Sequence, residues 1–254
     1  MNDVSIYLFD KKETLRGRFA DINIDRLPEF RRGRCIRYRR ETDKQACVIS
    51  YLLLRQGLYE KYLISEPVEF IYNDYSKPYL KDYPHIFFNI SHCEQGIVCA
   101  IADFEIGIDI QDIHPYDPAV AKLVCSLDEL RRLAESADPA RLFCRIWTAK
   151  ESYAKARGIG VANVLKLEPP EGAIAHREWE NFIVALCGGK RKADEIHIEW
   201  VNAHFGDLFP TGDPAPTGDP APTGDPVPNG DPAPRGDLVP TGDPVPTVLS
   251  NHPK

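Results

Sequence analysis

The chain has 254 residues, of which 43% are hydrophobic and 27% are charged, and its formal net charge at pH 7 is −7. This composition indicates a soluble globular protein with one large or two small folded units. It excludes a membrane-spanning helix, because no run of about 18 apolar residues is present. The charged N-terminal sequence MNDVSIYLFDKKE predicts that no secretory signal is present. Seven cysteines without a C-x-x-C pair predict free thiols and a cytoplasmic location.

The prolines of the chain are concentrated near its C-terminus. Twelve of the 22 lie between Pro210 and Pro246, and residues 211–246 are six tandem hexads, TGDPAP, TGDPAP, TGDPVP, NGDPAP, RGDLVP and TGDPVP. Proline at this density prevents helices and sheet ladders, and few side chains of the hexads could build a core. We therefore predict a disordered Pro-rich tail over residues 210–254. The hexads also carry most of the net negative charge, so the body before them has no strong acidic field.

The first half of the body is predicted to contain several strands and one helix. Alternation of side chains predicts a strand over residues 4–9. A helical pattern of apolar residues begins near Asp43, and Gly57 predicts its end. A short strand is expected at residues 70–72, before the turn-rich sequence NDYSKP. The densest strand signals lie at residues 86–91, 96–104 and 105–111, whose short gaps indicate neighbouring strands.

The second half is predicted to begin with helices. Ser126 and Glu129 have the S-x-x-E spacing of a capping box at the start of a helix. A second helix is expected to begin at Asp138–Pro139, which suit the N-cap and the first helical position. Gly158 is the natural end of that helix. The later runs FIVAL and IHIEW are strand-like.

One aspartate lies within the apolar sequence Ile106-Gly-Ile-Asp-Ile-Gln111. Strand alternation places the three isoleucines on one face and Gly107, Asp109 and Gln111 on the other. Burial of the Asp109 carboxylate is costly unless it is paired with a cation or with several hydrogen bonds. Two interpretations are open at this point. The carboxylate is either a metal ligand held on a rigid strand or a group that faces water on an edge strand.

The second predicted helix carries charged residues on its apolar side. Glu151 and Lys155 follow Trp147 at i+4 steps, and Lys150 lies seven residues after Phe143. Since residues at these spacings share one helix face, we expect all three charged side chains to point toward the core. The alternative is a surface ion pair between Glu151 and Lys155, which is worth only a few tenths of a kcal/mol.

Two further segments are rich in polar and charged groups. Ser91 and His92 end an apolar strand that follows Lys77, but adjacent residues on an extended chain point apart, so they are no hydrolase signature. The segment RRGRCIRYRR at residues 31–40 holds six arginines. Taken alone it indicates a solvated face or a nucleic-acid patch, although arginine also binds the phosphates of small molecules.

The order and spacing of these segments resemble those of the 4′-phosphopantetheinyl transferases. The shared motifs are Y-x-K-P, F-N-I-S-H, I-G-I-D-I and W-x-x-K-E-S-x-x-K, at residues 75–78, 88–92, 106–110 and 147–155. The resemblance covers residues 31–160 and is closest to the larger, monomeric type that activates surfactin-like peptide synthetases. It implies an α+β fold of two similar half-domains, each with a small antiparallel sheet and a long helix. We place these half-domains at residues 1–105 and 106–209, with the active site between them.

The resemblance also implies a reaction and a metal. Members of this family transfer 4′-phosphopantetheine from coenzyme A to a serine of an apo acyl or peptidyl carrier protein and release adenosine 3′,5′-bisphosphate. They use Mg²⁺, for which the implied ligands here are Asp109 and Glu151. Many relatives have a glutamate two residues after the aspartate, where this chain has Gln111, and its amide oxygen is the remaining candidate ligand. Glu151 is also implied as the base for the carrier serine.

The same motifs imply the remaining site residues. Lys155 would neutralise charge on the leaving phosphate and act with Glu151 in catalysis. Arg31 and Arg34 would hold the 3′-phosphate of coenzyme A. The full set of implied coenzyme A contacts is Arg31, Arg34, Lys77, Ser91, His92, Lys150 and Lys155.

We therefore expect a cytoplasmic, monomeric, Mg²⁺-dependent transferase with carrier protein as its partner, and with neither nucleic acid nor membrane as a partner. Two alternatives stay open. One is a nucleic-acid-binding protein that uses the arginine segment. The other is an impaired family member that binds only coenzyme A or carrier protein, as Gln111 suggests. Residues 169–209 match the family pattern poorly and suggest an incomplete C-terminal half-domain.

Overall fold

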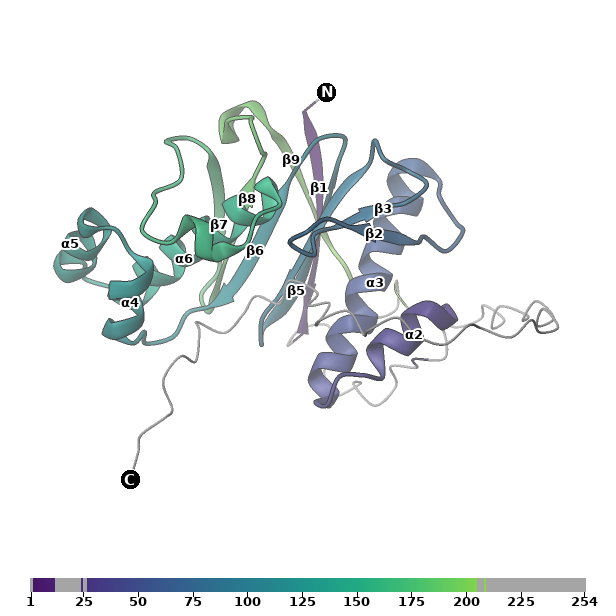
Figure 1. Cartoon of the computed structure of the whole chain (residues 1–254), viewed down its shortest axis with the longest axis horizontal. Coiled ribbons are helices and arrows are strands. Elements are labelled where there is room, and N and C mark those ends of the chain that lie inside the picture. Colours follow the sequence, from purple (N-terminus) through teal and green to yellow (C-terminus); the bar gives the residue numbers. More distant parts are fainter. Residues whose placement is uncertain (1, 12–23, 25–26, 205–207, 209–254) are drawn as a thin grey trace.

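The computed structural model describes residues 2–11, 24, 27–204 and 208 (Figure 1). The strands are β1 (Asp3–Asp10), β2 (Phe70–Tyr72), β3 (Pro78–Leu80), β4 (Phe87–His92), β5 (Gly96–Ala102), β6 (Gly107–Asp112), β7 (Ile174–Glu178), β8 (Phe182–Cys187) and β9 (His197–Asn202). The α-helices are α2 (Glu29–Cys35), α3 (Glu41–Tyr62), α4 (Pro118–Val124), α5 (Leu127–Glu135) and α6 (Pro139–Arg157). Short 3₁₀ helices lie at Val161–Val164 and Ala193–Glu195. The predicted tail at residues 210–254 lies outside the described residues.

The strands form three small sheets, and the predicted α+β class is confirmed. The first sheet has the order β4-β5-β1-β9, the second has the order β6-β8-β7, and β2 and β3 form a separate hairpin. All pairings are antiparallel except that of β1 with β9, which is parallel. Strand β9 comes from the second half of the chain, yet it extends the first sheet. The boundary that we place at residue 105 stays a prediction.

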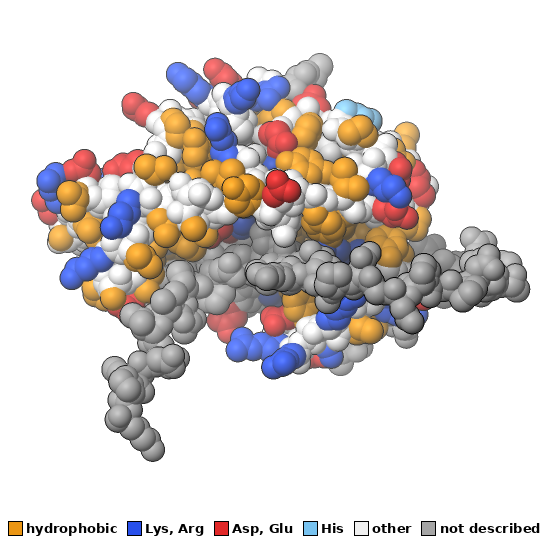
Figure 2. Space-filling view, viewed as in Figure 1, with side chains coloured by type: hydrophobic (Ala, Val, Ile, Leu, Met, Phe, Trp, Pro, Cys, Tyr) orange, Lys and Arg blue, Asp and Glu red, His pale blue; other side chains and the backbone are white. Residues whose placement is uncertain are grey.

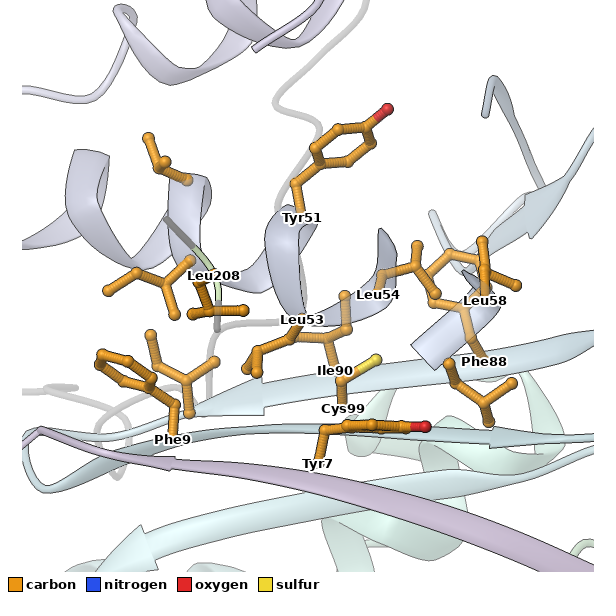
Figure 3. Close-up of a cluster of buried hydrophobic side chains, with 14 of the residues drawn as sticks. Tyr7, Phe9, Tyr51, Leu53, Leu54, Leu58, Phe88, Ile90, Cys99 and Leu208 are labelled. Atoms are coloured by element: carbon orange, nitrogen blue, oxygen red, sulfur yellow. The ribbon is translucent and has the colours of Figure 1, made fainter. Parts of the chain in front are cut away.

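Helix α3 covers one face of the first sheet and builds the larger core (Figure 3). Tyr7 and Phe9 of β1 point toward this helix, where they meet Leu53 and Leu54. The prediction that the helix ends near Gly57 is wrong, because α3 continues to Tyr62. A Cβ atom at position 57 would collide with side chains of the sheet, so the glycine serves close packing of the helix and does not terminate it.

The other face of the first sheet packs against the second sheet. Val4, Ile6 and Leu8 of β1 share a buried cluster with Ile108 and Ile110 of β6 and with inward-facing residues of β8. Helix α6 covers the remaining face of the second sheet, against β6 and β8. The elements are therefore stacked in the order α3, first sheet, second sheet and α6, as Figure 1 shows from the side.

The ends of α5 and α6 lie where the sequence predicts them. Ser126 and Glu129 form both hydrogen bonds of a capping box at the start of α5. The side chain of Asp138 accepts a hydrogen bond from the N–H of Arg141 at the start of α6. Gly158 ends α6 with a φ of 63°, a left-handed conformation that glycine adopts readily. The predicted limits of the helix that carries Lys150, Glu151 and Lys155 are therefore confirmed.

The prediction of free thiols is wrong for one pair of cysteines. Cys35 at the end of α2 and Cys47 in α3 form a disulfide, because packing of the two helices brings their Cα atoms to 5.8 Å. Five other cysteines, Cys93, Cys99, Cys125, Cys144 and Cys187, are free. Within the described part of the chain, no helix combines the length and the apolar character needed to cross a bilayer.

Candidate active site

Strand β6 directs its polar residues toward helix α6. Its isoleucines face the cluster between the two sheets, so Gly107, Asp109 and Gln111 point to the opposite face, as predicted. A Cβ atom built on Gly107 would overlap backbone atoms of Ser152 and Ala156 in α6. The glycine therefore allows direct contact between the backbones of the strand and the helix. This contact fixes the position of Asp109 on β6 relative to Glu151 on α6.

The carboxylate of Asp109 is fully buried at this contact, with 0% of the residue exposed. The ammonium of Lys155 lies 2.6 Å from its Oδ1, and the hydroxyl of Ser91 donates a hydrogen bond of 2.8 Å to the same oxygen. The other oxygen, Oδ2, is buried and accepts no hydrogen bond from the residues that the structure describes. The interpretation of Asp109 as a water-facing group is therefore wrong.

Burial and charge act in opposite directions on the pKa of Asp109. Removal from water disfavours the carboxylate and raises the pKa above its usual value. The positive charge of Lys155 and the hydrogen bonds from Lys155 and Ser91 lower it, with a smaller contribution from Gln111. A buried carboxyl that depends on a neighbouring cation for its charge is characteristic of functional sites.

Glu151 joins the same group from helix α6. The residue is 5% exposed, and its Oε2 lies 3.9 Å from the Lys155 ammonium. The alternative of a surface ion pair between Glu151 and Lys155 is therefore wrong, because both residues are buried. One ammonium thus faces two carboxylates, Asp109 and Glu151, from different elements. The donor set consists of an Asp109 oxygen that accepts no hydrogen bond from the described residues, the Glu151 carboxylate and the half-buried amide of Gln111. Hard oxygen donors of this kind fit Mg²⁺.

Asn89 holds β6 against β4 beside the site. The side-chain oxygen of Asn89 accepts a hydrogen bond of 2.8 Å from the N–H of Ile108, directly before Asp109. This bond bridges the two sheets at a place where the strand backbones are not paired. Sequence reasoning assigned no role to Asn89. An asparagine inside the apolar run FFNIS was the available signal, since a buried amide requires partners.

Two lysines with implied coenzyme A contacts are paired elsewhere in the structure. Lys150 is fully buried in α6, where its ammonium lies 2.9 Å from Oε2 of Glu129 in α5. Lys77 is buried beside Glu105, and its ammonium donates hydrogen bonds to the carbonyl oxygens of Ile106 and Ala156. Lys77 thereby ties β3 to the start of β6 and the end of α6. The geometry brings neither ammonium to the Asp109 carboxylate.

His92 is the last residue of β4, it is half-buried, and the charge of Lys155 acts on it. Its removal from water, and then the charges of Lys11 and Lys155, lower the pKa of His92 from 6.5 to about 4. The imidazole is therefore neutral at pH 7. Its Nδ1 is buried and has no hydrogen-bond partner among the described residues.

We expect His92 to make the fold sensitive to acid. A folded-state pKa below the unfolded value contributes stability that is complete above about pH 6.5 and is lost as the pH falls toward 4. The melting temperature of His92→Gln should therefore fall less steeply over this range than that of the wild type. Replacement of the exposed His85 by Gln should leave the slope unchanged. An unchanged slope in His92→Gln would contradict the prediction.

The arginine segment is only partly exposed. Arg31 is buried, and its guanidinium carbon lies 5.0 Å from the ring centre of Tyr51 and 5.1 Å from that of Phe70. Burial lowers the pKa of Arg31 to about 10, so the side chain stays charged at pH 7. Arg34 donates a hydrogen bond to the hydroxyl of Tyr72. The interpretation of the whole segment as a solvated face is therefore wrong for Arg31.

On the face that Figure 2 shows, lysine and arginine side chains alternate with acidic and hydrophobic ones. The nucleic-acid alternative stays a prediction.

Comparison with known proteins supports the recognised motifs. Residues 105–207 match the family model of the 4′-phosphopantetheinyl transferase superfamily. This match continues well beyond residue 160, where the resemblance seen in the motifs ends. The expectation that residues 169–209 match the family pattern poorly is therefore wrong for residues 169–207. The matched region contains β6, α6 and the three last strands, and so includes Asp109, Glu151 and Lys155.

Several curated relatives are similar over about half of the chain. The 4′-phosphopantetheinyl transferase gsp of Aneurinibacillus migulanus is 36% identical over 129 residues, which are 50% of this chain and 54% of the relative. The 4′-phosphopantetheinyl transferase psf-1 of Bacillus pumilus is 31% identical over 148 residues, 55% of this chain and 63% of the relative. The 4′-phosphopantetheinyl transferase Sfp of Bacillus subtilis is 29% identical over 135 residues, which are 52% of this chain and 60% of the relative. The chain thus spans 54% to 63% of these relatives' lengths.

Proposed function

We propose that this chain, a member of the 4′-phosphopantetheinyl transferase superfamily, transfers 4′-phosphopantetheine from coenzyme A to a serine of an apo acyl or peptidyl carrier protein. One observation carries the proposal. Asp109 of β6 and Glu151 of α6, which are distant in the sequence, face the same ammonium of Lys155. Two buried carboxylates beside a lysine suit a reaction that moves a phosphoryl group, since such transfer depends mainly on positioning and on charge stabilisation.

Asp109, Glu151 and the amide oxygen of Gln111 are the proposed ligands of Mg²⁺. Bound there, the ion would supply positive charge to the pyrophosphate of coenzyme A. Gln111 brings no negative charge, so this ligand set carries one charge fewer than a set with glutamate at that position. The buried Oδ2 of Asp109 supports the assignment, because the ion would be a partner for an oxygen that accepts no hydrogen bond from the described residues.

Glu151 is the proposed base. It accepts the proton of the carrier serine as the serine oxygen bonds to the phosphorus that bears pantetheine. The bond from this phosphorus to the bridging oxygen breaks, and adenosine 3′,5′-bisphosphate leaves. Lys155 donates hydrogen bonds to the phosphate oxygens, on which negative charge accumulates in this step.

The remaining polar residues are proposed to bind and orient coenzyme A. Arg31 and Arg34 hold the 3′-phosphate, which suits the permanent charge of arginine. Ser91, which donates a hydrogen bond to Asp109, and the neutral His92 are proposed to contact the pantetheine side of the pyrophosphate. Lys77 and Lys150 hold elements in place through their carboxylate partners, Glu105 and Glu129.

The proposal is tested by incubating the chain with coenzyme A, Mg²⁺ and an apo carrier protein. The mass of the carrier is then measured by mass spectrometry. We expect a gain equal to one phosphopantetheine group, and we expect a chelator to abolish it. The absence of a gain would contradict the transfer. If coenzyme A binding were retained in that case, the impaired-enzyme alternative would hold. Salt-dependent binding of DNA without any gain would favour the nucleic-acid alternative.

A further inference from the structure

Lys155 occupies an unusual position among the proposed catalytic groups. Its ammonium lies 2.6 Å from Oδ1 of Asp109, 3.9 Å from Oε2 of Glu151 and 3.2 Å from the hydroxyl of Ser91. Both carboxylates are proposed metal ligands, whereas the lysine is proposed to bind phosphate. The protein therefore places one of its own cations where the two carboxylates for a divalent cation meet.

We propose that Lys155 is an internal counter-ion that competes with the divalent cation for Asp109 and Glu151. Two buried carboxylates repel each other, and a cation between them offsets that repulsion. A divalent ion that binds both must either replace this ammonium or tolerate its charge at close range. The affinity of the site for the metal is therefore lowered as long as the Lys155 ammonium is paired with Asp109.

The same competition links the metal to the substrate. A phosphate oxygen of coenzyme A offers Lys155 an alternative anionic partner. When the ammonium moves to that partner, both carboxylates become fully accessible to the metal. Because linkage is reciprocal, the metal then strengthens coenzyme A binding by the same factor. The metal is thus bound tightly only in the complex that contains coenzyme A.

The direct test measures Mn²⁺ binding to the chain alone, by electron paramagnetic resonance or calorimetry, without coenzyme A. Removal of the Lys155 charge at contact distance strongly reduces the electrostatic repulsion on a bound divalent ion. We therefore expect Lys155→Met to bind Mn²⁺ about tenfold more tightly than the wild type. Lys155→Arg keeps the charge and should bind Mn²⁺ as the wild type does. Equal or weaker binding by Lys155→Met would overturn the proposal.

Lys150→Met is the matched control. It removes a buried lysine from the same helix by the same substitution, but that lysine is paired with Glu129 at 2.9 Å. Both variants should melt at lower temperature than the wild type, since each leaves a buried carboxylate without its partner. Only Lys155→Met should gain in Mn²⁺ affinity and regain its melting temperature when Mn²⁺ is added. A similar gain in Lys150→Met would show a general loosening and would overturn the proposal.

A measurement on the wild type covers the case in which Lys155→Met does not fold. Lysine side chains labelled with ¹³C at Cε are followed by NMR, and the Lys155 signal is identified by its absence in Lys155→Arg. We expect this signal to shift when Mg²⁺ alone is added to saturation. A signal that stays in place while the metal binds would overturn the proposal.

The inference rests on the proposed metal ligands, yet its failure differs from the failure of the proposed function. Transfer to a carrier without a change in Mn²⁺ affinity in Lys155→Met would reject only the counter-ion. A tenfold gain in Mn²⁺ affinity without transfer by the wild type would reject only the transferase activity.

Discussion

Replacement of Gly107 by alanine is expected to abolish transfer and to destabilise the fold. The added methyl group would overlap Ser152 O and Ala156 N and would lie 2.9 Å from Ala156 Cα, and all three are backbone atoms of α6. Backbone atoms of a helix cannot rotate away as a side chain can, so β6 and α6 must move apart. Overpacking of a core costs about 3 kcal/mol at the upper end of its usual range.

The separation of β6 and α6 would also separate Asp109 from Glu151, because these elements carry them. The measurements are the melting temperature and the carrier mass gain, and we expect a melting temperature lower by about 10 °C. Gly33→Ala is the control for stability, since a Cβ there has nothing within 4 Å. A Gly107→Ala protein that melts and transfers as the wild type does would show that the contact is not tight.

Replacement of Glu151 by glutamine is expected to remove activity while the fold is retained. The two side chains have the same shape, and glutamine can still fill the buried position beside Lys155. The amide cannot accept a proton and brings no charge to the metal. Loss of a general base alone costs roughly a hundredfold to ten-thousandfold in rate. The initial rate of carrier modification should therefore fall by at least about a hundredfold.

The control for this substitution is Glu178→Gln, which makes the same chemical change in strand β7. Glu178 of the edge strand β7 pairs with Arg141 and Arg145 of α6, and exposed pairs contribute little to stability. Its transfer rate should match that of the wild type. The circular dichroism spectra and the melting temperatures of both Glu151→Gln and Glu178→Gln should be close to those of the wild type. If Glu151→Gln kept a rate within twofold of the wild type, Glu151 would be neither base nor metal ligand.

Local patterns predict most of this site. Strand alternation alone places Gly107, Asp109 and Gln111 on one face, and i+4 spacing alone directs Glu151 and Lys155 toward the core. Both patterns depend on backbone geometry, which repeats along each element whatever packs against it. The limits of α6 are equally local, since an N-cap and a left-handed glycine act within one turn.

Partners that are distant in the sequence could not be predicted in this way. The burial of Lys150 follows from its helix face, but its pairing with Glu129 depends on how α5 packs against α6. The same holds for Lys77, whose hydrogen bonds reach the backbone of two other elements. Gly57 has the local signature of a helix end, and only the side chains of the first sheet explain why the helix continues.

The parallel pairing of β1 with β9 has a consequence for how this protein is made. Asp3 is aligned with His197, so β1 leaves the ribosome long before its neighbour β9 is available. One edge of β1 stays unpaired until β9 is made, and such edges recruit other chains. Completion of the first sheet is therefore a late, non-local event, and contacts of this kind slow folding.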